Sequence, residues 1–397
     1  MSNEISPVGP ETFELVQPGY LGTTPPVGQL PARGARVWVD RPEQLHQAVA
    51  TLTQARVIAI DAEFMQARVR KQGSGNSSVP RLSLLQLAIE QHCFVVDTLR
   101  LSDLSPLKAV VENPSIVILL HGSGADIRVM TERGLHVAHY YDLEAACRSI
   151  FGQHESSLAA MLKRAFHMHL DKSLQRTDWT RRPLPPAMIA YAARDAEVTL
   201  ALYGWLDQYY HDILQLHEYN GTPLQVAPWI EPFLRGNAPF SPEAAIADAQ
   251  ARGIIRNKAQ IYADCRDALQ RLTHPMYRNR LLRLIADLSL SKLVPDLIPL
   301  LNAPTSDERA GSVRALGRLN AKMAHEHITP LLHDPVYDVR KAAQSALRHL
   351  SSNGKEQRMT LAPGVDGVRR WATDEDEQTG DNQHGWKGRL RSIIDAS

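Results

Sequence analysis

The sequence predicts an α/β domain with a mixed sheet, followed by an all-α domain built from helical repeats. In the first half of the 397-residue chain, short apolar runs rich in β-branched residues alternate with segments whose apolar residues recur at helical spacing. In the second half the spacing is helical, and apolar and arginine positions repeat every 31 residues. A stretch rich in proline and glycine lies between the halves, as is typical of a linker.

Composition and charge are those of an ordinary globular protein. The chain is 44% hydrophobic and 22% charged, and its net charge of +1 shows no global bias toward a nucleic acid or a membrane surface. Three widely spaced cysteines, Cys93, Cys147 and Cys265, argue against a disulfide framework or a zinc site and fit a reducing compartment. Neither a membrane-spanning run nor a secretory signal is expected, so we predict a cytoplasmic protein.

The α/β domain begins after an arm rich in proline and glycine at 1–35, which we expect to be disordered. A short strand is predicted at 37–39, and a helix from Pro42 carries Leu45, Val49 and Leu52 on one face. The apolar run at 57–60 is predicted to be a buried strand.

Two carboxylates, Asp61 and Glu63, follow the strand at 57–60. Side chains alternate along a strand, so these two share one face while Ala62 points away. They repel each other unless a cation lies between them, and this pattern indicates divalent metal. Read alone, the pair fits two strand-end carboxylates that face water better than it fits a metal site.

The next elements complete the predicted domain, which we place at 36–211. A polar loop is expected at 66–81, strands at 82–89, 93–96 and 116–120, and helices at 101–111, 126–130, 142–151, 156–166 and 186–211. Asp126 follows the strand at 116–120 at a helix start, where an acid can also serve the helix dipole. Tyr191 and Asp195 lie four residues apart on one helix face, which is also common for a buried tyrosine beside a surface acid.

Together these clusters supply four carboxylates and one phenol to a single cleft. Four carboxylates in one cleft require cations, and two divalent ions about 4 Å apart suit in-line attack on a phosphodiester. Oxygen ligands favour Mg²⁺ or Mn²⁺ over zinc.

The helical half consists of a linker at 212–250, repeats at 251–351 and a polar flexible tail at 352–397. Arg278, Arg309 and Arg340 lie 31 residues apart, and leucines keep the same period. Repeats of this length with two helical patterns each resemble HEAT repeats, which stack into a solenoid. We expect the repeated arginines to form salt bridges between repeats or to cap helices.

The first domain resembles a known enzyme family through several motifs in register. Asp61-Ala62-Glu63, His121 with Asp126, and Tyr191 with Asp195 are similar to the three motifs of the DEDDy 3′→5′ exonucleases, in the RNase H-like superfamily, and in particular to ribonuclease D. The resemblance continues through 82–87, Tyr141-Asp142 and 171–183.

This resemblance implies a role for each motif residue. Asp61, Glu63 and Asp195 would hold one metal ion, and Asp61 with Asp126 a second one. Tyr191 would orient the attacking water, and the products would be nucleoside 5′-monophosphates.

We expect substrate contacts from residues that flank the motifs, namely Phe64, His121, Lys172, Gln175, Arg176 and Trp179. Trp179 fits base stacking and a place in the core equally well. Basic residues also gather at 163–182 and 252–283, either to grip a phosphate backbone or simply as solvated helix faces.

The sequence therefore predicts a metal-dependent 3′→5′ exoribonuclease that trims RNA 3′ ends, such as those of tRNA or structured precursors. The repeats would hold single-stranded RNA or dock a protein, and they stand where ribonuclease D carries helical modules of another type. Two alternatives remain open: a DNA 3′→5′ exonuclease, because the motifs do not read the sugar, and a non-catalytic RNA-binding scaffold.

Overall fold

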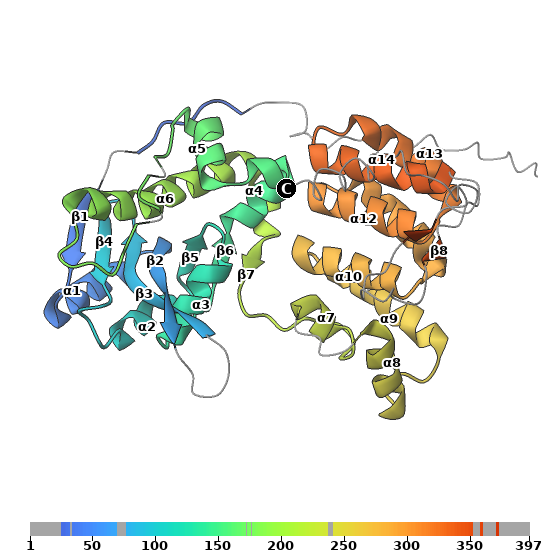
Figure 1. The fold of residues 1–397 in the computed structure, drawn as a ribbon, viewed down its shortest axis with the longest axis horizontal. Helices are drawn as coiled ribbons and strands as arrows, with labels where there is room; N and C mark the ends of the chain where they lie inside the picture. Colours follow the sequence, from blue (N-terminus) through green and yellow to red (C-terminus); the bar gives the residue numbers. More distant parts are fainter. Residues whose placement is uncertain are drawn as a thin grey trace, which may run out of the picture.

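The structure, a computed structural model, describes residues 25–31, 34–69, 77–171, 173–175, 177–236, 241–351, 358–359 and 371–372. Side chains are described for all of these except 66–69, 77–79, 358–359 and 371–372. Most of the arm expected at 1–35 and of the tail expected at 352–397 lies outside the described residues. Within them, a sheet with its helices lies beside a stack of helical repeats (Figure 1).

A seven-stranded mixed sheet forms the first part of the chain, in the order β1-β4-β3-β2-β5-β6-β7. Its strands are β1 (Ala35–Val39), β2 (Val57–Val69), β3 (Ser77–Ala88), β4 (His92–Asp97), β5 (Val117–Leu120), β6 (Tyr140–Asp142) and β7 (Glu218–Tyr219). β2 pairs antiparallel with β3 and parallel with β5, which confirms the expected mixed sheet. β6 and β7 were not expected, because they are too short to show an alternating pattern; β6 pairs with β5, and β7 joins the sheet through its pairing with β6, Tyr219 with Tyr140.

Helices cover both faces of the sheet (Figure 1). They are α1 (Pro42–Leu52), α2 (Lys108–Val111), α3 (Gly124–Glu132), α4 (Leu143–Phe151), α5 (Leu158–Phe166) and α6 (Pro186–Gln215). The long helix α6 packs its small residues Ala192, Ala193 and Ala196 into one core cluster with Ala59 of β2, and residues of α1, α2 and α3 form the cluster on the other face. The helix expected at 101–111 is shorter, because Asp103 accepts a hydrogen bond from the backbone N–H of Ser105 in an irregular turn.

The hairpin of β2 and β3 is longer than the sequence indicated. The loop expected at 66–81 is wrong at both ends, since the ladder continues from Phe64–Leu82 to Val69–Ser77. Backbone hydrogen bonds make this ladder, so the polar side chains that suggested a loop do not prevent it. The register shifts between Glu63 and Phe64, which leaves Ser83 as an extra residue in β3, a β-bulge.

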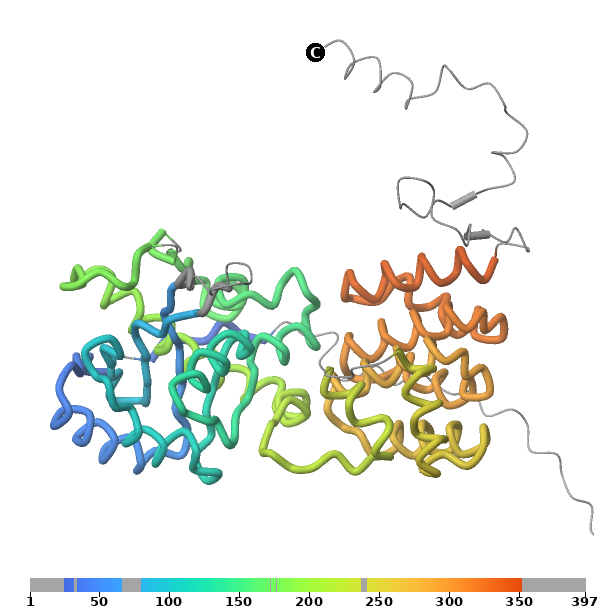
Figure 2. Tube along the Cα trace, turned by 60° about the horizontal axis from the view of Figure 1, so that its bottom comes forward, coloured from blue at the N-terminus to red at the C-terminus, as the bar shows by residue number. Residues whose placement is uncertain are grey.

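The second part of the described chain is a stack of helices around one hydrophobic core (Figure 2). The helices are α7 (Glu231–Arg235), α8 (Pro242–Ala251), α9 (Lys258–Arg271), α10 (Pro275–Asp287), α11 (Val294–Leu297), α12 (Ser306–Arg318), α13 (His325–Ile328) and α14 (Tyr337–Ser351), with a pair of two-residue strands at Arg358–Met359 and Trp371–Ala372. α11 and α13 continue into 3₁₀ turns at Ile298–Asn302 and Thr329–His333.

The repeated arginines bind as expected. Arg309 forms a buried ion pair with Asp334, 2.7 Å between Nε and Oδ2, and donates to the carbonyls of Ala303 and Pro304. Arg340 donates to the carbonyl oxygen of Asp334, and Arg278 pairs with Glu308 of the following repeat at 2.7 Å. The pairs of Arg278 and Arg309 confirm the prediction of salt bridges between repeats, whereas Arg340 donates to backbone carbonyl oxygens just before α14.

The repeats dock on α4 of the first part through direct hydrogen bonds. Ser149 Oγ donates to Asp307 Oδ2 at 2.7 Å, and Ser306 Oγ donates to the carbonyl oxygen of Arg148 at 3.0 Å. The backbone N–H of Gln153 donates to Asp338 at the start of α14. These bonds join the first turns of α12 and α14 to the end of α4 and to the turn that follows it. The repeats are therefore packed directly against the sheet domain.

Candidate active site

The first half of β2 presents its two carboxylates to helix α6, and the strand continues beyond them to Val69. Ala59 belongs to the core cluster that contains α6, whereas Ile58, Ile60 and Ala62 belong to the cluster on the other face. Asp61 and Glu63 continue the alternation that Ala59 begins, so they face α6 together. The sequence prediction that the two share one face is therefore confirmed.

Helices α6 and α3 complete the acidic cluster. Tyr191 and Asp195 lie one turn apart on α6, and Asp126 lies in the first turn of α3, just after β5. One ligand atom each of Asp61, Glu63 and Asp195 lies within 4.8 Å of the others. Asp126 does not belong to this group of three, but its charge acts on both Asp61 and Glu63, so it lies near them.

The electrostatics of this cluster call for a cation. Burial raises the pKa of Asp61 well above its usual value, and the charges of Asp126 and Asp195 raise it further. Burial and then the neighbouring acids, Asp61 first, raise the pKa of Glu63 to about 9. Burial, followed by the charge of Asp142, raises the pKa of Asp126 to about 7. A divalent ion would remove this repulsion, and oxygen donors suit a hard cation, so the residues fit a metal site.

Tyr191 stands beside the carboxylates as a neutral phenol. Burial raises its pKa, as do the charges of Asp195 and Glu63 and a side-chain hydrogen bond with Asp195. The phenol therefore stays protonated and can position a polar group, but it cannot serve as a base near neutral pH.

The residues expected to contact substrate differ in their burial, and two of them lie outside the described residues. Phe64 is half-buried against the core on the face away from α6, and Nε2–H of His121 donates a hydrogen bond to the carbonyl oxygen of Ser156 at 3.0 Å. Burial lowers the pKa of His121. Gln175 is exposed, while Lys172 and Arg176 lie outside the described residues.

Trp179 is only 1% exposed, so in this conformation it cannot stack on a base. It packs in the core with its ring 6.1 Å from that of Tyr191. Base stacking by Trp179 is therefore not supported, and its place in the core follows from its large apolar surface. Because it contacts Tyr191, it still belongs to the surroundings of the site.

Three residues that the sequence analysis did not single out for the site hold this segment in place. Arg182 donates from Nε and Nη2 to Asp97, both at 2.7 Å, and Asp97 is fully buried. Arg182 also donates to the backbone of Trp179 and of Ser83, and the hydroxyl of Ser83 donates to the carbonyl oxygen of Trp179. Their spacing along the chain carried no signal, because the contacts join residues up to 99 positions apart.

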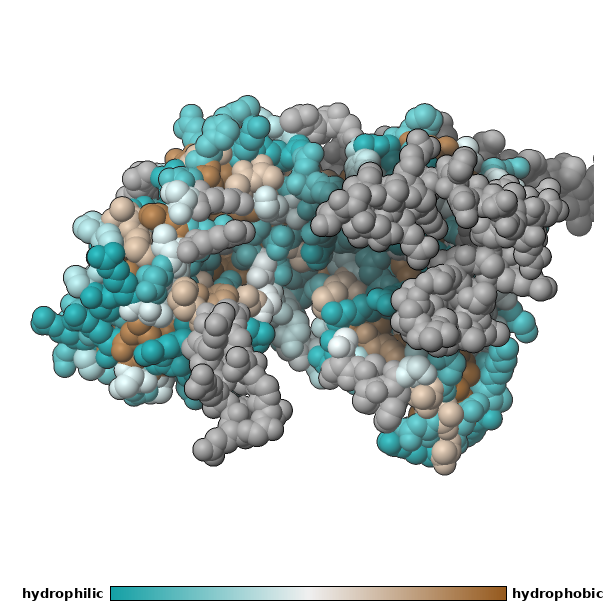
Figure 3. Space-filling model, viewed as in Figure 1, coloured by the Kyte–Doolittle hydropathy of each residue, from teal (hydrophilic) through white to brown (hydrophobic). Residues whose placement is uncertain are grey.

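Several of the basic residues expected to grip phosphate form ion pairs with acidic side chains. In the segment 252–283, Arg252, Arg266, Arg271 and Arg278 each pair with an acidic residue. In the segment 163–182, Arg164 pairs with Glu155 and Arg182 with Asp97. On the face that Figure 3 draws, hydrophilic side chains dominate the outer edges of both parts.

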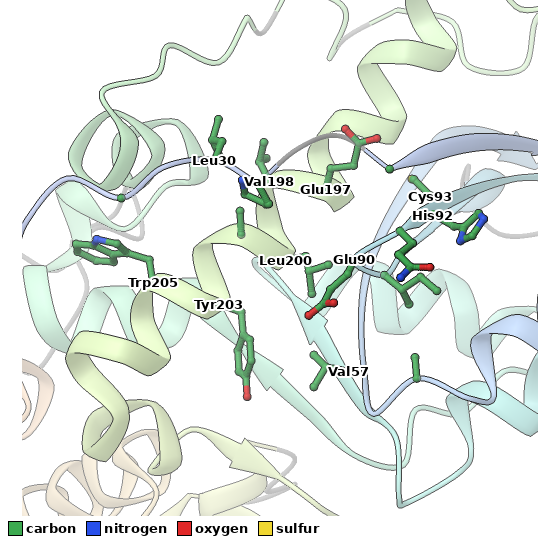
Figure 4. Close-up of a pocket in the computed structure, with 18 of the residues that line it drawn as sticks. Leu30, Val57, Glu90, His92, Cys93, Glu197, Val198, Leu200, Tyr203 and Trp205 are labelled. Atoms are coloured by element: carbon green, nitrogen blue, oxygen red, sulfur yellow. The ribbon is translucent and has the colours of Figure 1, made fainter.

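A pocket of about 1020 Å³ lies elsewhere on the sheet domain, between residues 28–31 with Gly34, the start of β4 and helix α6 (Figure 4). Glu197, Val198 and Trp205 line it from α6, and Cys93 lines it from β4. None of the four carboxylates lines it, so this pocket is separate from the acidic cluster.

In the described part of the chain, no helix is long and apolar enough to cross a membrane.

Comparison with known protein families finds a match for each of the two parts of the chain. Residues 36–209 match the model of a 3′–5′ exonuclease domain, and residues 264–348 match HEAT repeats. The first match covers the sheet domain up to helix α6, and the second covers the helical repeats from α9 to α14.

Two curated relatives illustrate the similarity. The exosome complex component 10 homolog of Drosophila melanogaster is 31% identical over 53% of this chain and 23% of its own length. Ribonuclease D of Escherichia coli is 34% identical over 37% of this chain and 39% of its own length. The chain thus spans less than half the length of either relative. The crystal structure of Escherichia coli ribonuclease D is similar with a TM-score of 0.40 at 22% identity, over 79% of this chain and 73% of that one.

Proposed function

We propose that this chain, whose residues 36–209 match a 3′–5′ exonuclease domain, is a metal-dependent 3′→5′ exoribonuclease that releases nucleoside 5′-monophosphates. One observation carries the proposal: Asp61, Glu63 and Asp195 bring ligand atoms within 4.8 Å of one another, beside Asp126 and the phenol of Tyr191. This donor set fits phosphodiester hydrolysis.

The carboxylates would hold two divalent ions, Mg²⁺ or Mn²⁺. Asp61, Glu63 and Asp195 would hold one, and Asp61 with Asp126 the other. When bound, such ions favour attack of water on the phosphodiester and stabilise the leaving 3′-oxygen. The raised pKa values of Asp61 and Glu63 support this arrangement, because they show a cluster that repels added negative charge.

Tyr191 would orient the attacking water through its hydroxyl group. Asp195 bonds to the same phenol and keeps it in place, one helical turn away. Ala192, Ala193 and Ala196 pack α6 closely against the sheet, so the phenol is held on a rigid element.

For the substrate we propose single-stranded RNA 3′ ends, including those of tRNA or other structured precursors, acted on in the cytoplasm. The names of the relatives, ribonuclease D and an exosome component, support RNA over DNA. Three buried cysteines without disulfides fit a reducing compartment. The HEAT repeats would dock RNA or a protein.

The test is an assay with 3′-labelled single-stranded RNA and the matching DNA, each with Mg²⁺ and with Mn²⁺. We expect nucleoside 5′-monophosphates from RNA, and no release by the Asp61→Asn variant. Faster release from DNA would favour a DNA exonuclease. RNA binding without release, with either metal, would favour a scaffold and contradict the proposal.

A further inference from the structure

One buried side chain beside the acidic cluster has no structural explanation in the fold itself. Gln86 of β3 is fully buried, and its pairing partner across the strands is Asp61. Within the described part of the chain, neither Nε2 nor Oε1 of Gln86 has a hydrogen-bond partner. Burying an amide without partners costs stability, and a leucine would fill the same space without that cost.

The register places this amide within reach of Asp61. Leu84 and Ala88, two residues to either side on β3, belong to the core cluster that contains α6. Gln86 therefore faces α6 as Asp61 does, and directly opposed residues of antiparallel strands have Cβ atoms about 4.5–5.5 Å apart. The side chain of Gln86 is long enough to bridge that separation.

Within the described residues, one hydrogen-bond donor acts on the carboxyl of Asp61. Apart from burial, the influences on its carboxyl are the acids Asp126 and Asp195 and one backbone N–H, that of Ala62. Carboxylates that bind metal are usually held in orientation by further hydrogen bonds from neighbouring groups. The Nε2–H of Gln86 is a neutral donor on the correct face of the neighbouring strand.

We propose that Gln86 is a positioning residue of the metal site: when a cation binds, its amide, which has no partner in this structure, turns so that Nε2 donates a hydrogen bond to the carboxylate of Asp61 and holds it in the orientation that binds the cation. The inference rests on the proposed function, because it assumes that the carboxylates bind metal. It explains why the chain retains a polar side chain at a fully buried strand position.

The test compares Mn²⁺ binding and metal-free stability in Gln86→Met and in a matched control, Leu84→Met. Leu84 is also fully buried on the same face of β3 and pairs with Glu63, so it probes packing beside a carboxylate without removing a donor. Calorimetric titration of the metal-free proteins with MnCl₂ gives the affinity, and thermal unfolding without metal gives the stability.

We expect Gln86→Met to bind Mn²⁺ about 10- to 100-fold more weakly than the wild type, while its metal-free melting temperature is unchanged or higher. Leu84→Met should bind Mn²⁺ with wild-type affinity. A role in packing alone would instead lower the melting temperature of Gln86→Met and leave the affinity for Mn²⁺ unchanged.

The other outcomes are equally distinct. Wild-type affinity in Gln86→Met, with Mn²⁺ binding intact in the wild type, would overturn this inference and leave the proposed function standing. No binding of Mn²⁺ by the wild type would overturn the proposed metal site and this inference with it. If Gln86→Met does not fold, Gln86→Leu is measured, and failure of both to fold would show that Gln86 serves the fold and not the metal.

Discussion

At the scale of single residues, the carboxylates of the acidic cluster repel one another, and this repulsion destabilises the folded protein. Asp61, Glu63 and Asp126 all have a raised pKa, with burial as the largest cause in each case. A raised pKa means that the folded protein binds protons more tightly than the unfolded chain, so without metal the charged carboxylates weaken the fold. The same crowding gives the site its attraction for a cation.

Asp61→Asn should therefore separate stability from activity. Without metal, stability of the wild type falls as pH rises from about 4, the ordinary carboxyl range, toward about 9, the pKa of Glu63, because the folded state must release protons that it prefers to keep. We expect the variant to melt higher than the wild type at pH 8 without metal, and to lose exonuclease activity at least about 100-fold. Glu132→Gln, an exposed change on α3, should alter neither property.

Tyr191→Phe removes only the hydroxyl group beside Asp195. If the phenol orients water, kcat should fall about 100-fold or more while the affinity for Mn²⁺ stays within a few-fold of the wild type. Tyr203→Phe, a half-buried tyrosine further along α6, is the matched control and should keep full activity. Unchanged kcat in Tyr191→Phe would rule out this role.

At the scale of elements, the bulge of β3 connects β2, which carries Asp61 and Glu63, to the segment that precedes α6. Ser83 is the extra residue of the bulge. Its carbonyl oxygen accepts a hydrogen bond from Arg182, and its hydroxyl group donates one to the carbonyl oxygen of Trp179. Bulges commonly redirect side chains next to active sites. Here the bulge fixes Trp179 against Tyr191, so the position of the phenol depends on contacts that come from β3 and β4.

The ion pair of Arg182 with Asp97 should be the strongest single contact of this connection. Arg182→Leu leaves a fully buried carboxylate without its main partner, and we expect a loss of about 3–5 kcal/mol in the free energy of unfolding by urea. Arg100→Leu removes a 57% exposed neighbour that also lies 4.0 Å from Asp97, and should cost less than about 1 kcal/mol. Equal losses in the two variants would contradict this account.

At the scale of the whole molecule, two histidines lie where the repeats meet the sheet domain. His217 bonds to Ser149, and its ring lies 5.4 Å from that of His274, whose Nδ1 caps α10. Burial, together with the charge of His274, lowers the pKa of His217 to about 3, and burial lowers the pKa of His274 to about 4. Both rings are thus neutral in the folded protein at ordinary pH.

Acid should weaken this junction. In the unfolded chain the histidines take up protons near pH 6.5, but in the folded protein only near pH 3–4, so the stability they contribute is full above pH 6.5 and is lost as pH falls toward 4. At pH 5 the loss should be about 2 kcal/mol for each histidine, measured by urea unfolding.

The double variant His217→Gln/His274→Asn keeps a donor and a helix cap but cannot take up these protons. Its stability should therefore fall less than that of the wild type between pH 6.5 and pH 5. His136→Asn, an exposed histidine, is the control and should behave as the wild type does. Identical pH profiles for the double variant and the wild type would show that the junction does not respond to acid.

The sequence by itself determined the strand that carries Asp61 and Glu63, the helix that carries Tyr191 and Asp195, and the 31-residue repeat with its paired arginines. These features depend on local periodicity, which is written directly into the chain. Only the tertiary structure decided the length of the β2–β3 hairpin, the burial of Trp179, the pairing of Arg182 with Asp97 and the place of Gln86 opposite Asp61. Each of these features depends on strand register or on contacts between residues distant in sequence. Strand register and long-range contacts do not follow from the spacing of residues along the chain.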